Sequence, residues 1–197
     1  MPTRDGTRDS SKSKAKKIVE TISFQIVTSC VDHSALLEQM IVDYHESQWC
    51  ELPILLSCLR ALAFTHQMSH WTSSGDPFYG DHLLFERLYN DIVPEIDTVA
   101  EKAVGMGGSI MLHPVHQANH EALLINTMCG QGTNIPNASE LSQRSYQAEM
   151  HFMGMLNALV ERMKTNGCWS VGVENMLGEI ADKHEGHIYL LKQRVAG

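Results

Sequence analysis

Residues 70–108 decide the fold, and they read HWTSSGDPFYGDHLLFERLYNDIVPEIDTVAEKAVGMGG. Ser, Gly, Asp and Pro at positions 73–77 are typical of a loop. From about Tyr79 to Val104 the sequence is rich in apolar residues with helical spacing, and the glycines at 105, 107 and 108 are typical of a helix end. We therefore predict a helix that ends near His70 and a second, long helix over about 79–104.

The long helix carries two pairs of ionisable side chains. His82 and Glu86 are four residues apart, as are Asp97 and Glu101, so each pair shares a helix face. The eleven residues from Glu86 to Asp97 make three helical turns with about 20° left over, which places all four side chains on one stripe. The apolar neighbours on this helix predict burial, and buried carboxylates need partners. Imidazole and carboxylate together suit iron and other transition metals.

The two pairs are too far apart to hold one ion within a single chain. Glu86 and Asp97 are separated by about 16 Å along the helix axis, whereas coordination distances are near 2 Å. Two copies packed antiparallel about a twofold axis bring His82 and Glu86 of one copy to Asp97 and Glu101 of the other. The same contact then occurs twice, which predicts two identical sites in each dimer.

The rest of the chain predicts an all-α protein. Apolar stripes and turn residues predict further long helices over about 51–73, 140–165 and 171–195, with a short helix over about 116–128 in the central connection. Four long helices favour a four-helix bundle over residues 49–197. Residues 1–16 are expected to be a flexible basic arm, and residues 17–48 an N-terminal helical extension whose second helical piece has Ser34 as its N-cap.

At this point the sequence resembles a known family, the DNA-protection-during-starvation (Dps) miniferritins of the ferritin-like superfamily. The resemblance is best over residues 52–108 and looser over the last two helices. The residues that carry it are His70, Trp71, Gly75, Phe78, His82, Glu86, Leu88, Tyr89, Asp97, Glu101, Gly107 and Gly108, with Asp182, Lys183, His184, Glu185 and His187 in the closing helix.

The resemblance implies a function and an assembly. It implies a ferritin-like bundle that forms a hollow homo-oligomer, a dodecamer built from twofold dimers. It implies a ferroxidase that oxidises Fe(II) with hydrogen peroxide or dioxygen and stores the ferric mineral, which protects against oxidative damage. His70, His82 and Glu86 of one subunit would bind iron together with Asp97 and Glu101 of its mate. Trp71 would lie beside the site and intercept stray oxidising equivalents.

Two residues depart from the family pattern. Glu86 stands where the family more often has Asp, and its longer side chain changes the second iron position. Pro94 lies inside the predicted helix between the two ligand pairs, where it removes one backbone hydrogen bond and favours a kink. These departures leave an alternative open, in which the protein is a DNA-compacting or structural cage with weak or lost ferroxidase activity. A four-helix metal protein acting on an organic substrate is disfavoured, because the chain lacks the two Glu-x-x-His motifs of single-chain di-iron bundles.

Charge and composition limit the other partners and the cellular location that the sequence predicts. Residues 1–17 hold six Lys or Arg residues against two Asp residues, although the whole chain has a net charge of −8. This basic arm predicts non-specific DNA binding, or else only a solubilising terminus. No apolar run is long enough to span a membrane, so we expect a cytoplasmic protein, associated with the nucleoid if it binds DNA. The five scattered cysteines predict buried free thiols rather than disulfides.

Several other histidines could bind a metal. His113, His116 and His120 predict either a surface zinc or copper site or a solvated short helix. His184 and His187 could form a second metal position, although histidines hydrogen-bonded within packed helices are the simpler interpretation. His66 lies one turn before His70, so it could supply a third imidazole near the iron.

Overall fold

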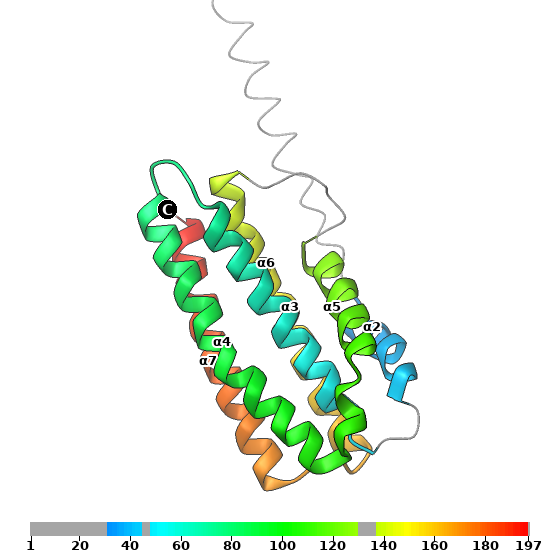
Figure 1. Ribbon diagram of the computed structural model, residues 1–197. Coiled ribbons are helices and arrows are strands. Elements are labelled where there is room, and N and C mark those ends of the chain that lie inside the picture. Colours follow the sequence, from blue (N-terminus) through cyan, green and yellow to red (C-terminus); the bar gives the residue numbers. More distant parts are fainter. Residues whose placement is uncertain (1–30, 45–47, 130–136, 197) are drawn as a thin grey trace, which may run out of the picture. The chain divides into compact units, whose positions relative to one another are not determined.

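A computed structural model describes residues 31–44, 48–129 and 137–196 (Figure 1). The described residues after Val31 belong to one compact unit, Asp32–Gly197. The predicted basic arm and residues 17–30 of the predicted extension lie outside the described residues. The predicted boundaries at residues 16 and 48 stay predictions.

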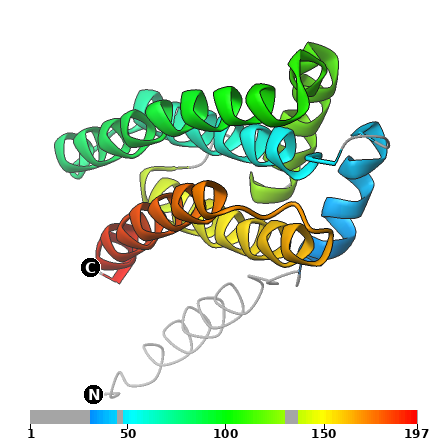
Figure 2. The same cartoon turned by 90° about the horizontal axis from the view of Figure 1, so that it is seen from below.

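The described part is all-helical and contains no strand. Its α-helices are α2 (His33–Ile41), α3 (Glu51–Thr72), α4 (Phe78–Gly107), α5 (Pro114–Cys129), α6 (Ala138–Thr165) and α7 (Val171–Ala196), with 3₁₀ turns η1 (Val42–Tyr44) and η2 (Ser109–Leu112). The four long helices form two layers, α3 with α4 and α6 with α7, as Figure 2 shows. The predicted ferritin-like four-helix bundle with a short helix in its central connection is confirmed.

The local sequence explains where the helices begin. α6 begins with a capping box, in which the Asn137 side chain accepts from the Glu140 backbone N–H and the Glu140 carboxylate accepts from that of Asn137. The predicted N-cap of the first described helix was wrong by two residues. Asp32, not Ser34, caps α2, because its carboxylate accepts hydrogen bonds from the N–H groups of both Ser34 and Ala35.

Only some of the glycines that predicted a helix end lie where a helix ends in the structure. Gly167 has φ +73°, the left-handed conformation that ends α6, and Gly108 has φ +84° just after α4. α4 continues through Gly105 to Gly107, so it is longer than predicted. Glycine weakens a helix by only about 1 kcal/mol, and packing of this last turn on η2 outweighs that. Pro94 is accommodated inside α4, which is helical from end to end.

The core lies between the two helical layers. Its fully buried members come from all four long helices and include Leu62, Ile92, Phe152 and Val173. A smaller cluster of Phe85, Leu88, Leu141 and Leu191 lies elsewhere in the bundle. Burying one such side chain contributes about 1.5–3 kcal/mol, so these two clusters provide most of the stabilisation.

The smaller elements cover the bundle from outside. α5 packs on α3, and α2 packs on α6; Figure 1 shows α5 beside α3. Cys50, Cys58 and Cys168 are buried free thiols, as predicted, and the side chains of Cys30 and Cys129 lie outside the described residues. Among the described helices, none combines the length and the apolar character needed to cross a membrane.

Candidate functional site

The structure brings His70 and His82 together. His70 lies in the last turn of α3, and His82 lies in the second turn of α4, across the intervening loop. Their rings stack with centroids 3.7 Å apart and planes inclined by 24°. Tyr89 contacts His70 edge-on, and Phe78 packs against His82. Two imidazoles that are twelve residues apart in sequence therefore form one fixed pair.

Backbone contacts set the tautomer of both rings. The Nδ1 atom of His70 lies 2.9 Å from the carbonyl oxygen of His82, and Nδ1 of His82 lies 3.2 Å from the carbonyl oxygen of His70. A carbonyl oxygen can only accept, so each Nδ1 carries the proton. In a neutral ring the Nε2 atom then keeps its lone pair. A backbone carbonyl on the other nitrogen is a common way to orient a metal-binding histidine.

The remaining predicted ligands extend along α4 and do not converge within one subunit. Glu86 lies one turn after His82 and is half-buried, while Asp97 and Glu101 are exposed three turns further on. None of these three carboxylates has an ion-pair or hydrogen-bond partner among the described side chains. Trp71 follows His70 and is 61% exposed. One subunit thus presents an incomplete ligand set.

The predicted burial of α4 is confirmed for Phe85, Leu88 and Ile92 but is wrong for its outer side. Leu83 and Val93 are 45% and 51% exposed, although the sequence predicted an apolar, buried helix. The reason is that α4 has neighbours on its inner side only, so its outer apolar residues remain uncovered. Exposed apolar side chains also occur on α3 and in the first turn of α4. The outer face of this layer is defined by Phe64, Met68, Trp71, Phe78, Tyr79, Leu83 and Val93.

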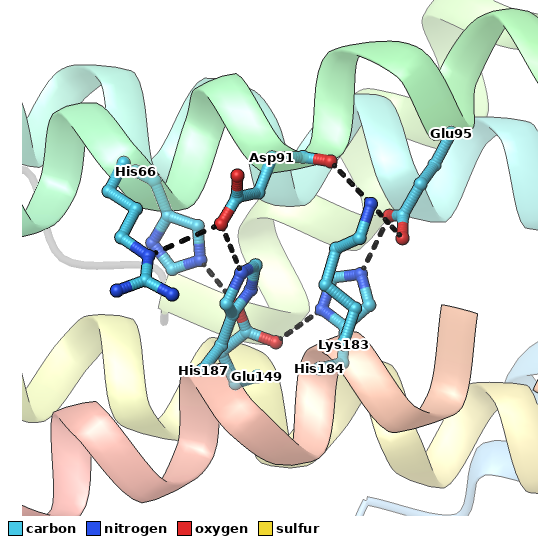
Figure 3. A network of polar contacts seen from close by, with 8 residues as sticks. His66, Asp91, Glu95, Glu149, Lys183, His184 and His187 are labelled. Atoms are coloured by element: carbon cyan, nitrogen blue, oxygen red, sulfur yellow. Dashed lines mark hydrogen bonds and ion pairs between the residues drawn. The ribbon is translucent and has the colours of Figure 1, made fainter. Parts of the chain in front are cut away.

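A second group of ionisable residues lies inside the bundle (Figure 3). Glu149 of α6 is completely buried and contacts three imidazoles. His66 Nε2 and His187 Nδ1 lie 2.8 and 3.0 Å from its Oε1 atom. His184 Nδ1 lies 2.7 Å from its Oε2 atom. Within the described residues, Glu149, His184 and His187 are the group in which three suitable ligand atoms lie within 4.8 Å of one another.

Two carboxylates of α4 contact the far sides of these rings. Glu95 Oε2 lies 3.1 Å from His184 Nε2, and Asp91 Oδ2 lies 3.4 Å from His187 Nε2. Lys183 Nζ lies 3.1 Å from Glu95 Oε1 and donates to the Asp91 carbonyl. As Figure 3 shows, this polar cluster draws side chains from all four long helices. We call it the bundle-core cluster, defined by His66, Asp91, Glu95, Glu149, Lys183, His184 and His187.

The protonation pattern of the bundle-core cluster follows from these contacts. Burial opposes ionisation of Glu149, but hydrogen bonds from His184, His187 and His66 outweigh it and hold the pKa of this carboxyl well below its usual range. Burial also lowers the pKa of His184, yet its bonds to Glu149 and Glu95 prevail and raise it to about 9. For His66, burial prevails and lowers the pKa. The metal-free cluster therefore contains an ionised Glu149, a protonated His184 and a neutral His66.

Sequence reasoning found only part of this cluster. His184 and His187 were visible as a candidate pair, whereas Glu149 is a single residue on another helix and gave no signal. Asp91 and Glu95 are four residues apart on α4, a spacing that places them on one helix face, but the sequence analysis did not single them out. His66 does not join His70 and His82, since its ring contacts Glu149 instead.

The histidines of the central connection do not form a three-ligand site among the described residues. The rings of His113 and His116 are 4.4 Å apart. His120 is buried, and its Nε2 lies 2.9 Å from Asp43 Oδ2. The predicted surface zinc or copper site therefore has no support from this geometry.

The architecture and the paired histidines define a class of protein, the ferritin-like four-helix bundles. Solved structures share this fold. Dps from Thermosynechococcus elongatus superposes with a TM-score of 0.64 at 16% identity, covering 85% of this chain and 96% of that one. DpsC from Streptomyces coelicolor gives a TM-score of 0.63 at 23% identity, covering 75% of this chain and 83% of that one.

Curated sequences narrow the class. A nutrient stress-induced DNA-binding protein of Synechococcus sp. is 25% identical over 122 residues, which are 61% of this chain. DNA protection during starvation protein 1 of Deinococcus radiodurans is 26% identical over 137 residues, or 62% of this chain. Each match spans 66% of the relative's length. No family model matches the chain. These matches confirm the predicted resemblance to the Dps miniferritins.

Proposed function

We propose that the protein is a Dps-type ferroxidase that oxidises Fe(II) at sites shared by two copies of the chain and stores the ferric product inside a homo-oligomeric cage. The observation that carries this proposal is the fixed pair of His70 and His82. Both rings donate from Nδ1 to a backbone carbonyl, which leaves each Nε2 free for a metal.

The exposed carboxylates support a shared site. Asp97 and Glu101 lie on the same helix as His82, but about 22 Å and about 28 Å further along it. They are exposed and have no partner among the described side chains. A second copy related by a twofold axis would supply them to the histidines, and the same contact would occur twice.

The outer face of α3 and α4 supports the same arrangement. Seven large apolar side chains are exposed there, including Trp71 and Val93. An exposed apolar face of this kind marks a protein–protein contact. A second copy packed on it would cover these side chains and desolvate the iron ligands. The dodecameric cage is the assembly that we expect from the family.

The chemistry requires the ligands to favour the ferric product. The imidazoles of His70 and His82 suit Fe(II), and the carboxylates of Glu86, Asp97 and Glu101 add negative charge that stabilises Fe(III). Two ferrous ions give one electron each to one hydrogen peroxide, whose O–O bond breaks. With water, the products are two ferric oxyhydroxide units and four protons. Trp71, next to the site, could donate an electron to oxidising equivalents that escape.

Mixing two inactive variants tests the shared site. We expect the His82→Ala and Asp97→Ala proteins each to lose peroxide-driven iron oxidation, because every site then lacks a ligand. A dimer of the two variants has one intact site and one that lacks both residues. After random reassembly about a quarter of the sites should be intact, so about a quarter of the wild-type initial rate should return.

The control is a mixture that cannot complement. His82→Ala and His70→Ala alter the same side of the site, so no mixed dimer regains a full ligand set. Size-exclusion chromatography must show that all three variants assemble alike. Equal rates for the complementing and the control mixtures would refute the shared geometry.

A second candidate function is DNA binding through residues 1–17. The six basic residues of this segment favour it, and the Synechococcus relative is itself a DNA-binding protein. This role would place the protein on the nucleoid in the cytoplasm. Deleting residues 1–17 should abolish a salt-sensitive gel shift with duplex DNA and leave iron oxidation unchanged. If the full chain gives no shift at low salt, the DNA-binding function is excluded.

A further inference from the structure

We propose that Glu149, His184 and His187 bind one divalent transition-metal ion inside each subunit, at a site separate from the shared iron site. Their ligand atoms are two imidazole nitrogens and one carboxylate oxygen, which lie within 4.8 Å of one another. The three residues come from α6 and α7. An ion there would link the two helices of one layer.

The ligands already point at a common centre. His184 Nδ1 and His187 Nδ1 both face the Glu149 carboxylate, at 2.7 and 3.0 Å. In the metal-free protein these contacts are hydrogen bonds. A metal ion would replace the Nδ1 protons and accept the lone pairs that they occupy, with small outward movements of the rings.

The contacts made by the second nitrogen of each histidine ring have the pattern found around metal sites in proteins. A metal-binding histidine usually donates its second ring N–H to a carboxylate, which fixes the ring and raises its basicity. Here both rings do so, His184 through Nε2 to Glu95 and His187 through Nε2 to Asp91. Both carboxylates belong to α4, so a third helix orients the ligands.

The charge balance also favours a cation. Glu149, Glu95 and Asp91 supply three carboxylates, whereas Lys183 and the more distant Arg87, 3.5 Å from Asp91, supply two fixed positive charges. These fixed charges sum to one negative charge. The proton on His184 balances it in the metal-free protein, and a bound metal ion would replace that proton as the source of positive charge.

The donor set selects the class of metal. Two imidazoles and one carboxylate suit Fe(II), Zn(II) and their neighbours, whereas Mg(II) and Ca(II) prefer oxygen ligands throughout. Glu149 and His184 are completely buried and His187 is 2% exposed. An ion held there would be shielded from bulk solvent, which fits a structural ion better than one that turns over.

Cobalt binding tests the site without relying on iron oxidation. The full-length His82→Ala protein, which lacks a complete shared site, is stripped with a chelator and titrated with Co(II), a visible-absorbing substitute for Zn(II) or Fe(II). We expect one tightly bound Co(II) per subunit with ligand-field bands typical of nitrogen and oxygen ligands. Competition with Zn(II) and with Fe(II) under anaerobic conditions then ranks the two natural metals.

Two further variants in the same background locate the ion. His82→Ala with His187→Gln should lose the cobalt bands. His82→Ala with His120→Gln is the matched control, because His120 is also buried against a carboxylate but lies outside the cluster, and it should retain them. Retention of the bands in the His187→Gln protein would overturn the proposal.

Anomalous diffraction decides the matter if the His187→Gln protein does not fold. Crystals of the wild-type protein grown with Co(II) are measured on both sides of its absorption edge. A peak among Glu149, His184 and His187 supports the proposal. Peaks confined to other positions, or no peak, overturn it. Neither result depends on whether the protein oxidises iron.

Discussion

Removing the carboxylate of Glu149 should be among the most destabilising single changes in the bundle. The carboxylate is completely buried and holds three imidazoles, of which His184 is positively charged. In Glu149→Ala, His184 keeps only Glu95 as a counter-ion, and His66 and His187 lose an acceptor. Breaking a buried ion pair by removing one partner costs about 3–5 kcal/mol, and we expect a loss in this range.

Glu149→Gln separates the charge from the shape. The amide oxygen can still accept from His66 and His187, and the amide nitrogen then faces His184, which must give up its Nδ1 proton. Losing hydrogen bonds to a charged group costs about 1.5–3 kcal/mol, so Gln should destabilise less than Ala. The order wild type, Gln, Ala is therefore the expected order of stability.

Guanidinium denaturation with chelator present measures both variants. The subunit concentration must be held fixed, because assembly contributes to the apparent stability. Glu161→Ala is the control, since it makes the same change at an exposed position of the same helix, and it should shift stability by less than about 0.5 kcal/mol. If Glu149→Ala loses less than about 1 kcal/mol, Glu149 does not carry the buried charge network that we describe.

Three further predictions concern the helices around this network. Burial lowers the pKa of His33 on α2 and of His151 on α6, whose facing nitrogens are 3.4 Å apart. Because protonation of these rings opposes their burial, α2 should dock fully above pH 6.5 and loosen from α6 as the pH falls below 6.5. Hydrogen-exchange protection of the α2 amides measures this. Gly154→Ala should weaken the same contact by about 1–3 kcal/mol, because its Cβ would lie 2.4 Å from the His33 ring, whereas Gly178→Ala, with open space, should stabilise by about 0.4–1 kcal/mol. Pro94→Ala should raise the guanidinium midpoint, because proline in a helix interior costs up to about 3 kcal/mol.

Each of these has its own contrary result. Equal α2 protection on both sides of pH 6.5 would mean that the histidine pair does not titrate with docking. Equal effects of Gly154→Ala and Gly178→Ala would show that the His33 ring yields freely. A lower midpoint for Pro94→Ala would show that α4 depends on the geometry that Pro94 imposes.

The sequence was sufficient for the helices because their signals are local. Loop residues at 73–77, the glycine after Asn166 and the capping residues before α6 all act over a few positions, so the predicted helices agree with the observed ones to within a few residues. The exceptions also arise locally, where two neighbouring signals favoured different helix boundaries. Asp32 displaced Ser34 as the cap of α2, and packing carried α4 through Gly105.

The two candidate sites differ in the same way, because one depends on residues close in sequence and the other on how distant helices pack together. The pairing of His70 with His82 spans one loop, and the resemblance to the Dps family anticipated it. The bundle-core cluster depends on which faces of four helices meet, and no local spacing encodes that. Only the His184 and His187 pair, three residues apart on one helix, was visible beforehand.

The position of Glu149 also restricts how the helices can be assembled. Its partners are distributed over α3 and α7, and theirs over α4. Sliding any one helix by a turn, about 5.4 Å, would leave apolar surfaces in contact but would leave ionised side chains buried without their partners. Apolar side chains alone tolerate such slippage, so this single carboxylate discriminates the native alignment from its near neighbours during folding.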